Sequence, residues 1–153
     1  MTVDVDVAVE SGRIPLSRAR VARIARAVFI AERVRNAELS IAFVSNGTIA
    51  ALNRKHLGHH GATDVISFEL SRAPRSPVTG DIYIAPDVAR EQARRLGVPV
   101  REELARLVVH GTLHVLGYSH PDGSEEERTR SPMWRRQERI LARVLDDLLD
   151  GRA

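Results

Sequence analysis

The sequence predicts an α+β domain in which a small mixed β-sheet is packed with helices. Two kinds of segment support this class: short runs with apolar residues at every second position, and longer runs with apolar residues at helical spacing. They follow one another in the order β-α-β-α-β-β-α-α-α. Because no repeat, low-complexity segment or linker divides the chain, we expect a single domain over residues 1–153.

The first half of the chain is expected to run strand, helix, strand, helix. Residues 3–9, VDVDVAV, place valine at every second position and predict a strand. Residues 15–36 carry apolar side chains at helical spacing, and LSIAFVS, residues 39–45, predicts the second strand. A short helix is expected within residues 45–57, because this segment opens on residues that cap a helix N-terminus.

Two strands and three helices are expected in the second half. Residues 63–70 and 80–86 are rich in β-branched and aromatic side chains and predict strands. A helix follows and ends near Gly97, and the next, over residues 101–117, ends on a glycine that can take a left-handed turn. The last helix begins near Pro132. Its residues at core spacing are Met133, Trp134, Gln137, Ile140, Leu141, Val144, Leu145 and Leu148.

The composition narrows the chemistry that the protein can perform. There is no cysteine, which excludes disulfides, thiolate catalysis and thiolate-bound metal, so any metal must take histidine, carboxylate or water ligands. The N-terminus resembles no signal peptide, and no segment approaches the roughly 20 apolar residues of a membrane span. We therefore expect a cytoplasmic protein without a membrane partner.

The basic charge is almost entirely arginine. The formal net charge is +3, and Lys55 is the only lysine. Arginine suits phosphate because its guanidinium binds two oxygens at once, although an ordinary arginine-rich surface explains the composition equally well. The basic excess lies in the first two-thirds of the chain, where any nucleic-acid surface is expected.

Three histidines in the segment HGTLHVLGYSH, residues 110–120, predict a metal site. His110 and His114 are four residues apart, so both project from one face of the expected helix. Gly117 allows the chain to turn back, so that His120 can supply a third ligand. Three ligands leave one tetrahedral position open for water, whose pKa zinc lowers to about 7. We therefore expect one catalytic Zn²⁺ per chain.

Gly111 indicates which bond such a site would cleave. A family of zinc proteases shares this histidine spacing but has a catalytic glutamate at the position of Gly111. Without that base peptide hydrolysis is disfavoured, and a metallopeptidase with a distant carboxylate is the weakest alternative. Phosphodiester cleavage depends less on this group, because a metal stabilises charge on phosphate oxygens and RNA carries its own 2′-hydroxyl.

The segment VVHGTLHVLGYSH resembles the signature of the YbeY family, bacterial metal-dependent endoribonucleases of rRNA maturation. Four other segments match that family in order: LNRKHLGHHGATDVISF, GDIYIA, QARRLG and MWRRQERIL. The resemblance implies an α+β fold, zinc on His110, His114 and His120, and single-strand-specific RNA cleavage in 16S rRNA 3′-end maturation and ribosome quality control. The partners that it implies are single-stranded rRNA, the small ribosomal subunit and its assembly factors.

One departure from the family pattern bears on activity. Where the family usually has an arginine, this chain has Leu57, which cannot clamp a phosphate. His56, His59 and His60 lie in the same loop and could replace part of the lost charge when protonated, or they could simply form a polar loop. A zinc-containing assembly or RNA-binding factor that does not cut RNA is therefore the main alternative. The sequence does not identify the general base.

Three further residues are expected near the metal or the substrate. Ser119 replaces an acidic residue of the family that would orient a ligand or water. Thr63 and Asp64 open a strand that the resemblance puts beside the site, and Asp64 either binds a ligand histidine or caps a turn.

Overall fold

The elements of the computed structural model follow the predicted order, with one helix added. The structure describes residues 2–10, 12–58, 61–71, 75–119 and 125–149. The elements are β1 (Thr2–Val9), α1 (Arg18–Ala31), β2 (Asn36–Phe43), α2 (Asn46–Leu52), η1 (Asn53–Leu57), β3 (Val65–Ser71), β4 (Val78–Ile84), α3 (Pro86–Leu96), α4 (Val100–Val115), α5 (Glu125–Thr129) and α6 (Pro132–Leu149). The sequence did not predict α5.

Two predicted helices differ from the observed ones by more than two residues at an end or in the type of helix. α1 ends at Ala31, five residues before the predicted end, because Arg33 takes a left-handed backbone conformation with φ of 58° that a helix cannot continue through. The helix expected within residues 45–57 is α2 followed directly by η1, one π-helical turn that ends at left-handed Gly58. Both differences arise at helix ends, where a periodic pattern carries the least information.

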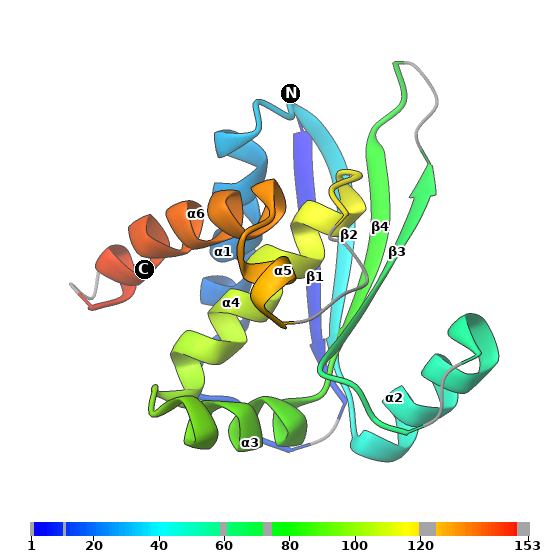
Figure 1. The fold of residues 1–153 in the computed structure, drawn as a ribbon. Coiled ribbons are helices and arrows are strands. Elements are labelled where there is room, and N and C mark those ends of the chain that lie inside the picture. The colour runs from blue at the N-terminus through cyan, green and yellow to red at the C-terminus, as the bar shows by residue number, and fades with distance from the viewer. Residues whose placement is uncertain (1, 11, 59–60, 72–74, 120–124, 150–153) are drawn as a thin grey trace.

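The four strands form one mixed sheet in the order β1-β2-β4-β3. β1 pairs in parallel with β2, and β2 with β4, while β3 runs antiparallel to β4 at the edge. Parallel neighbours need a crossover connection, and α1 provides it between β1 and β2. Figure 1 shows α1, α4 and α6 layered on one face of the sheet and α2 at the lower end of the other. The structure is thus the predicted α+β domain.

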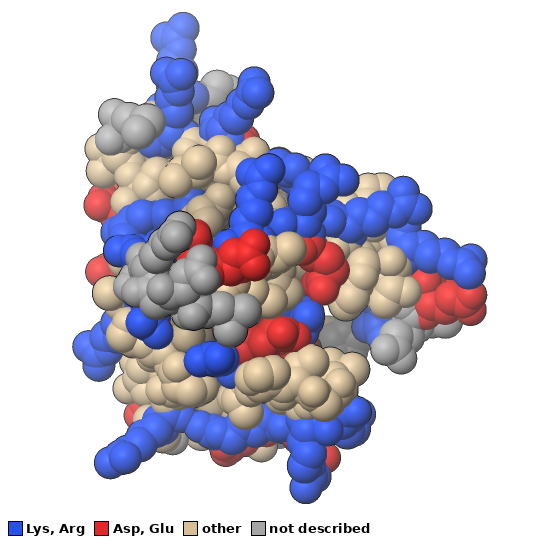
Figure 2. Space-filling view, turned by 90° about the vertical axis from the view of Figure 1, so that its left-hand side faces the viewer, with Lys and Arg blue, Asp and Glu red and all other residues tan. Residues whose placement is uncertain are grey.

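Two groups of charged side chains lie on opposite sides of the sheet. On the face of the sheet away from α1, α4 and α6 lies a group of carboxylates, here called the acidic sheet face: Asp4, Asp6, Glu38 and Asp81. On the helix-covered side α6 exposes Arg135, Arg139 and Arg143. Figure 2 shows lysine and arginine side chains at many points around the edge of that side.

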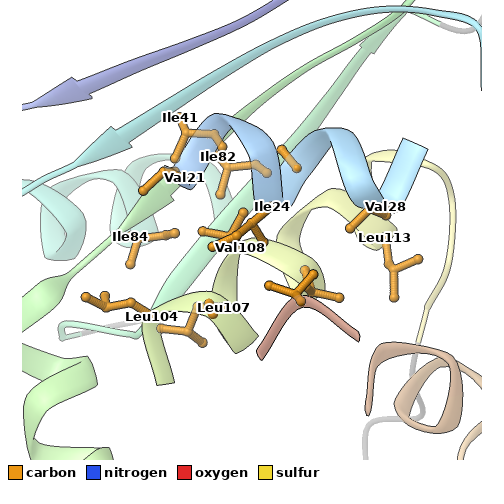
Figure 3. Packing of buried hydrophobic residues seen from close by; sticks show 14 of the residues in the cluster. Val21, Ile24, Val28, Ile41, Ile82, Ile84, Leu104, Leu107, Val108 and Leu113 are labelled. Atoms are coloured by element: carbon orange, nitrogen blue, oxygen red, sulfur yellow. The ribbon is translucent and has the colours of Figure 1, made fainter. Parts of the chain in front are cut away.

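The core lies between the sheet and the helix layer, with α4 at its centre. Every second residue of β2 is buried toward the helices, including Leu39 and Ile41. α4 packs against α1, α3, α6, β3 and β4, and Leu104, Val108 and Leu113 of this helix are fully buried. Figure 3 shows these three side chains meeting apolar residues of α1 and the strands. Burying each such side chain stabilises the fold by about 1.5–3 kcal/mol, which fixes α4 as a rigid support.

None of the helices that the structure describes is both long enough and apolar enough to cross a membrane.

Candidate metal centre

α4 presents a row of polar side chains to a cleft of about 850 Å³. The row consists of Glu103, Arg106, His110 and His114, spaced three or four residues apart on one helical face. Other segments that line the cleft include the two residues before β3, β3 itself, the end of α3, α5 and the start of α6. They contribute, among others, Thr63, Asp64, Leu96, Arg128, Trp134 and Gln137.

The imidazoles of His110 and His114 face each other at the cleft. Their Nε2 atoms are 3.0 Å apart, and the ring centroids are 4.5 Å apart with an interplanar angle of 80°. Each Nδ1 atom meets an oxygen: that of His110 lies 2.6 Å from Oε1 of Gln137, and that of His114 lies 2.9 Å from the carbonyl oxygen of Tyr118. The structure thus brings together two of the three predicted ligands.

These contacts determine which ring nitrogen carries the proton. The amide of Gln137 donates its Nε2 hydrogen to Oε2 of Glu138 at 3.0 Å, which leaves its Oε1 to accept from His110. The carbonyl of Tyr118 can only accept. Both Nδ1 atoms therefore donate, and each neutral ring keeps a lone pair on Nε2. Two lone pairs facing each other at 3.0 Å repel, so the arrangement suits a cation bound by both.

Zinc fits the donors that are present. Two nitrogens bound to one tetrahedral zinc ion at about 2.0–2.1 Å are roughly 3.3 Å apart, close to the observed separation. Neutral imidazole is a preferred zinc ligand, and a hydrogen bond from its second nitrogen is the usual way of orienting it. His120, the predicted third ligand, lies outside the described residues. Within the described part of the chain no three potential ligands come together.

The end of α4 explains how His114 acquires its acceptor. Gly117 has φ of 100°, a left-handed conformation that reverses the chain after the helix. The amide of Tyr118 then donates to the carbonyl of Leu113 at 3.0 Å, and the Tyr118 carbonyl turns back onto the His114 ring. The phenol of Tyr118 is anchored to Glu32, and this hydrogen bond raises the phenol pKa. Gly117 thus orients the His114 imidazole in addition to turning the chain.

Arg106 is surrounded by carboxylates. Its guanidinium lies 2.9 Å from Glu103, 3.3 Å from Glu102 and 3.2 Å from Glu138. Burial raises the pKa of Glu103, and Arg106 opposes that effect. Although burial lowers the pKa of Arg106, its hydrogen bonds to Glu138 and Glu103 raise it above the ordinary value. Arg106 is therefore charged and held by protein carboxylates.

Thr63 and Asp64, which the sequence analysis named as candidate neighbours of the site, are among the residues that line the cleft. Oδ1 of Asp64 accepts the backbone N–H of Val65 at 2.8 Å, and Oδ2 accepts from Gln92 at 3.1 Å. Asp64 therefore caps the start of β3. Ser119 is exposed and is not among the described residues that line the cleft.

Leu57 and His56, which the sequence analysis placed in one loop, lie on different surfaces of the molecule. Leu57 lines the cleft with 49% of its surface exposed, so the position at which the family resemblance implies an arginine lies at the cleft. His56 instead packs edge-on against Phe68, with ring centroids 5.2 Å apart. Phe68 points away from α4, because successive residues of a strand alternate between faces and Ser67 faces the helix. His59 and His60 lie outside the described residues.

Gly111 is required by packing. A Cβ atom at this position would lie 2.9 Å from Cγ2 of Ile82 and 3.0 Å from Oγ of Ser67. Ile82 is fully buried in β4 and cannot move aside. The position points at the sheet, so a catalytic glutamate could not occupy it without displacing α4.

Gly111→Ala is expected to lower the free energy of unfolding by about 1–3 kcal/mol, because the added methyl overpacks the contact between α4 and the sheet. Denaturant unfolding of the purified variant measures the loss. Gly47→Ala is the matched control, because the nearest atom to its added Cβ is 3.9 Å away. This control should match the parent or gain up to about 1 kcal/mol from helix propensity. Equal stability of both variants would contradict the packing argument.

Sequence reasoning did not identify Gln137 as a residue of the site. It lies at core spacing in α6 between Met133 and Leu141 and is only 1% exposed. A buried amide needs hydrogen-bond partners, so a glutamine in the apolar stripe of a helix is itself a signal of a polar site. Its partner could not be read from the sequence, because His110 is 27 residues away on another helix.

The cleft and its histidine pair define a small α+β protein with a candidate metal centre on its central helix. The chain belongs to the YbeY family: the family model described as "Endoribonuclease YbeY" matches residues 6–145. It is similar to proteins of that name from Bacillus licheniformis, 37% identical with 94% of this chain and 96% of the relative covered, and Thermobifida fusca, 37% identical with 92% and 93% covered. The family name assigns it to nucleases that cut RNA internally.

A solved structure shares the fold. The solution structure of TM1509 from Thermotoga maritima matches with a TM-score of 0.66 over 96% of this chain and 93% of that one, at 22% sequence identity. This likeness supports the architecture of the sheet and helices.

Proposed function

We propose that the protein is a zinc-dependent, single-strand-specific endoribonuclease that acts in the cytoplasm on the 3′ end of 16S rRNA and in ribosome quality control. The observation that carries the proposal is the pair of Nε2 atoms facing each other at 3.0 Å in a cleft of about 850 Å³. The family name supports RNA as the substrate. The small ribosomal subunit and its assembly factors are proposed partners on the basis of the family resemblance alone.

His110 and His114, together with His120, would hold the zinc ion. When bound, zinc supplies a Lewis acid that stabilises charge developing on phosphate oxygens. Gln137 and the Tyr118 carbonyl keep the Nδ1 protons of the two described histidines in place, so that both Nε2 atoms remain available as ligands. Leu107 and Met133, both buried at the cleft, exclude water from part of its wall, which strengthens electrostatic interactions inside.

The wall of the cleft suits single-stranded RNA. Trp134 and the half-exposed Leu96 and Leu57 offer apolar surface on which unstacked bases can lie. Arg128, exposed on α5, offers a guanidinium for a phosphate. A duplex keeps its bases stacked inside and cannot use the apolar surface.

One observation favours a second candidate, a zinc-containing RNA-binding factor that does not cut RNA. Leu57 occupies the cleft position where the family pattern has arginine, and Arg106, the arginine of α4 that lines the cleft, is bound to three carboxylates. A metallopeptidase is disfavoured further, because Gly111 faces the sheet.

Cleavage of a single-stranded 16S rRNA 3′ precursor by the purified protein tests the proposal. We expect cutting with zinc, loss of cutting with a chelator and recovery on zinc addition. The fluorescence of Trp134, the only tryptophan in the chain, reports RNA binding in the same samples. A fluorescence change without cutting would overturn the nuclease and favour the binding factor.

In that case Leu57→Arg should introduce cutting, because it returns a cation to the cleft. Leu70→Arg is the matched control: Leu70 is 56% exposed on β3 and is not among the described residues that line the cleft. Cutting by both variants, or by neither, would show that position 57 does not govern activity.

A further inference from the structure

A chain of hydrogen bonds connects Arg106 to the metal ligand His110 through two residues of α6. Nε and Nη2 of Arg106 lie 3.2 and 3.3 Å from the two carboxylate oxygens of Glu138. Oε2 of Glu138 accepts from Nε2 of Gln137 at 3.0 Å, and Oε1 of Gln137 accepts from Nδ1 of His110 at 2.6 Å. In each contact of this chain, a hydrogen-bond donor of one residue meets an acceptor of the next.

The orientation of the Gln137 amide decides whether His110 can bind a metal. Rotated by half a turn, the amide would direct its N–H group at Nδ1, and His110 would have to accept there and carry its proton on Nε2. An imidazole protonated on Nε2 cannot bind zinc through that atom. Gln137 is only 1% exposed, so water does not hold its amide in the correct orientation.

Glu138 is the group that selects the orientation. A carboxylate only accepts hydrogen bonds, so it pairs with the N–H end of the Gln137 amide and turns the oxygen toward His110. Arg106 fixes the carboxylate with two hydrogen bonds. The His114 ring is oriented by a backbone carbonyl instead, so its tautomer does not depend on this chain of hydrogen bonds.

We propose that Glu138, held by Arg106, is a positioning residue that sets the Gln137 amide and thereby keeps Nε2 of His110 available to zinc. The proposal rests on the zinc centre of the proposed function. The proposal gives Arg106 a role at the metal centre, whereas the position of Arg106 in the cleft alone would suggest that it binds phosphate.

The test is zinc affinity, measured by competition with a chromogenic chelator for the parent, Glu138→Gln and Glu102→Gln. Loss of an orienting partner of a ligand typically weakens metal binding by 10–100-fold, and we expect about this loss for Glu138→Gln. Glu102→Gln is the matched control, because Glu102 also binds Arg106 and has similar side-chain exposure, 23% against 33% for Glu138. We expect its affinity to stay within about twofold of the parent, since the Gln137 amide donates to Glu138, whereas Glu102 accepts from Arg106.

The double variant Gln137→Glu with Glu138→Gln distinguishes positioning from a merely structural role. It exchanges the two side chains, keeps the net charge and gives His110 a carboxylate that accepts in either orientation. It should recover zinc affinity to within about fivefold of the parent, even if Glu138→Gln alone unfolds too readily to be measured. Thermal unfolding of the zinc-free proteins shows separately whether each variant folds.

The outcomes separate this proposal from the proposed function. Failure of the parent to bind zinc would overturn the metal centre itself. Zinc binding by the parent with equal affinity in Glu138→Gln would overturn only the role of Glu138. Failure of the double variant to recover affinity while it remains folded would do the same.

Discussion

His114→Ala is expected to abolish RNA cleavage and to weaken zinc binding by roughly 100-fold or more, since it removes one of two facing nitrogens. The fold should survive, because the His114 ring is only partly buried at the cleft and the Tyr118 carbonyl can bind water in its place. Zinc content after gel filtration and cleavage of the rRNA precursor measure the two effects. Because the variant is purified in the same way as the parent, any cleavage that remains in its samples reveals a contaminating ribonuclease.

His56→Ala is the matched control for the loss of an imidazole. His56 is exposed and packs against Phe68, on the face of β3 away from α4. Zinc content and cleavage should both remain within about twofold of the parent, because the His56 ring packs against Phe68 and is not among the described residues that line the cleft. The metal centre as described would be refuted by a His114→Ala protein that keeps stoichiometric zinc, or by an equal loss in both variants.

Arg106→Met is expected to lower the free energy of unfolding at pH 7 by about 3 kcal/mol, because it leaves the buried carboxylate of Glu103 without its cation. The Glu103 side chain is 4% exposed and that of Arg106 17%, so water compensates little. Methionine keeps most of the apolar contacts of the arginine stem. Urea unfolding monitored by circular dichroism gives the difference.

The loss should depend on pH with a definite sign. Burial raises the pKa of Glu103, and removal of Arg106, which lowers it, raises it further. A carboxyl whose pKa is raised in the folded state stabilises the fold below its unfolded pKa of about 4.3, and this stabilisation is lost as the pH rises through the folded value. The difference between parent and Arg106→Met should therefore be largest near neutral pH and shrink toward pH 4.

Arg94→Met serves as the control for this prediction. Arg94 forms an ion pair with Glu91 of the same helix, but its side chain is 76% exposed. Solvent screens such a pair, so we expect no measurable change in stability at either pH. An equal loss for both variants would mean that the burial of Glu103 is not the cause.

The local part of the site could be predicted from the sequence. The spacing of His110 and His114 places both on one face of a helix whatever the rest of the fold, and Gly117 marks the helix end by its own conformational freedom. The element order followed from apolar periodicity in the same way, because each segment carries its own signal. The role of His120 stays a prediction.

The remaining features depend on packing between distant segments. The contact of Gln137 with His110 requires α6 to pack against α4, and the contact of His56 with Phe68 requires η1 to lie on the face of the sheet away from α4. Gly111 was read as a missing base, whereas the nearness of Ile82 explains why no larger residue fits. Such contacts depend on how side chains fill space in three dimensions, which the pattern of residues along the sequence does not reveal.

The carboxylates of the acidic sheet face and the exposed arginines of α6 lie on opposite sides of the sheet. A polyanion that approaches by diffusion should therefore be repelled by the first group and attracted by the second. Both effects are expected to weaken as the ionic strength rises, because screening limits the range of a charge to about 8 Å at physiological salt. The carboxylates of the acidic sheet face would thereby direct encounters toward the side of the protein that carries the arginines.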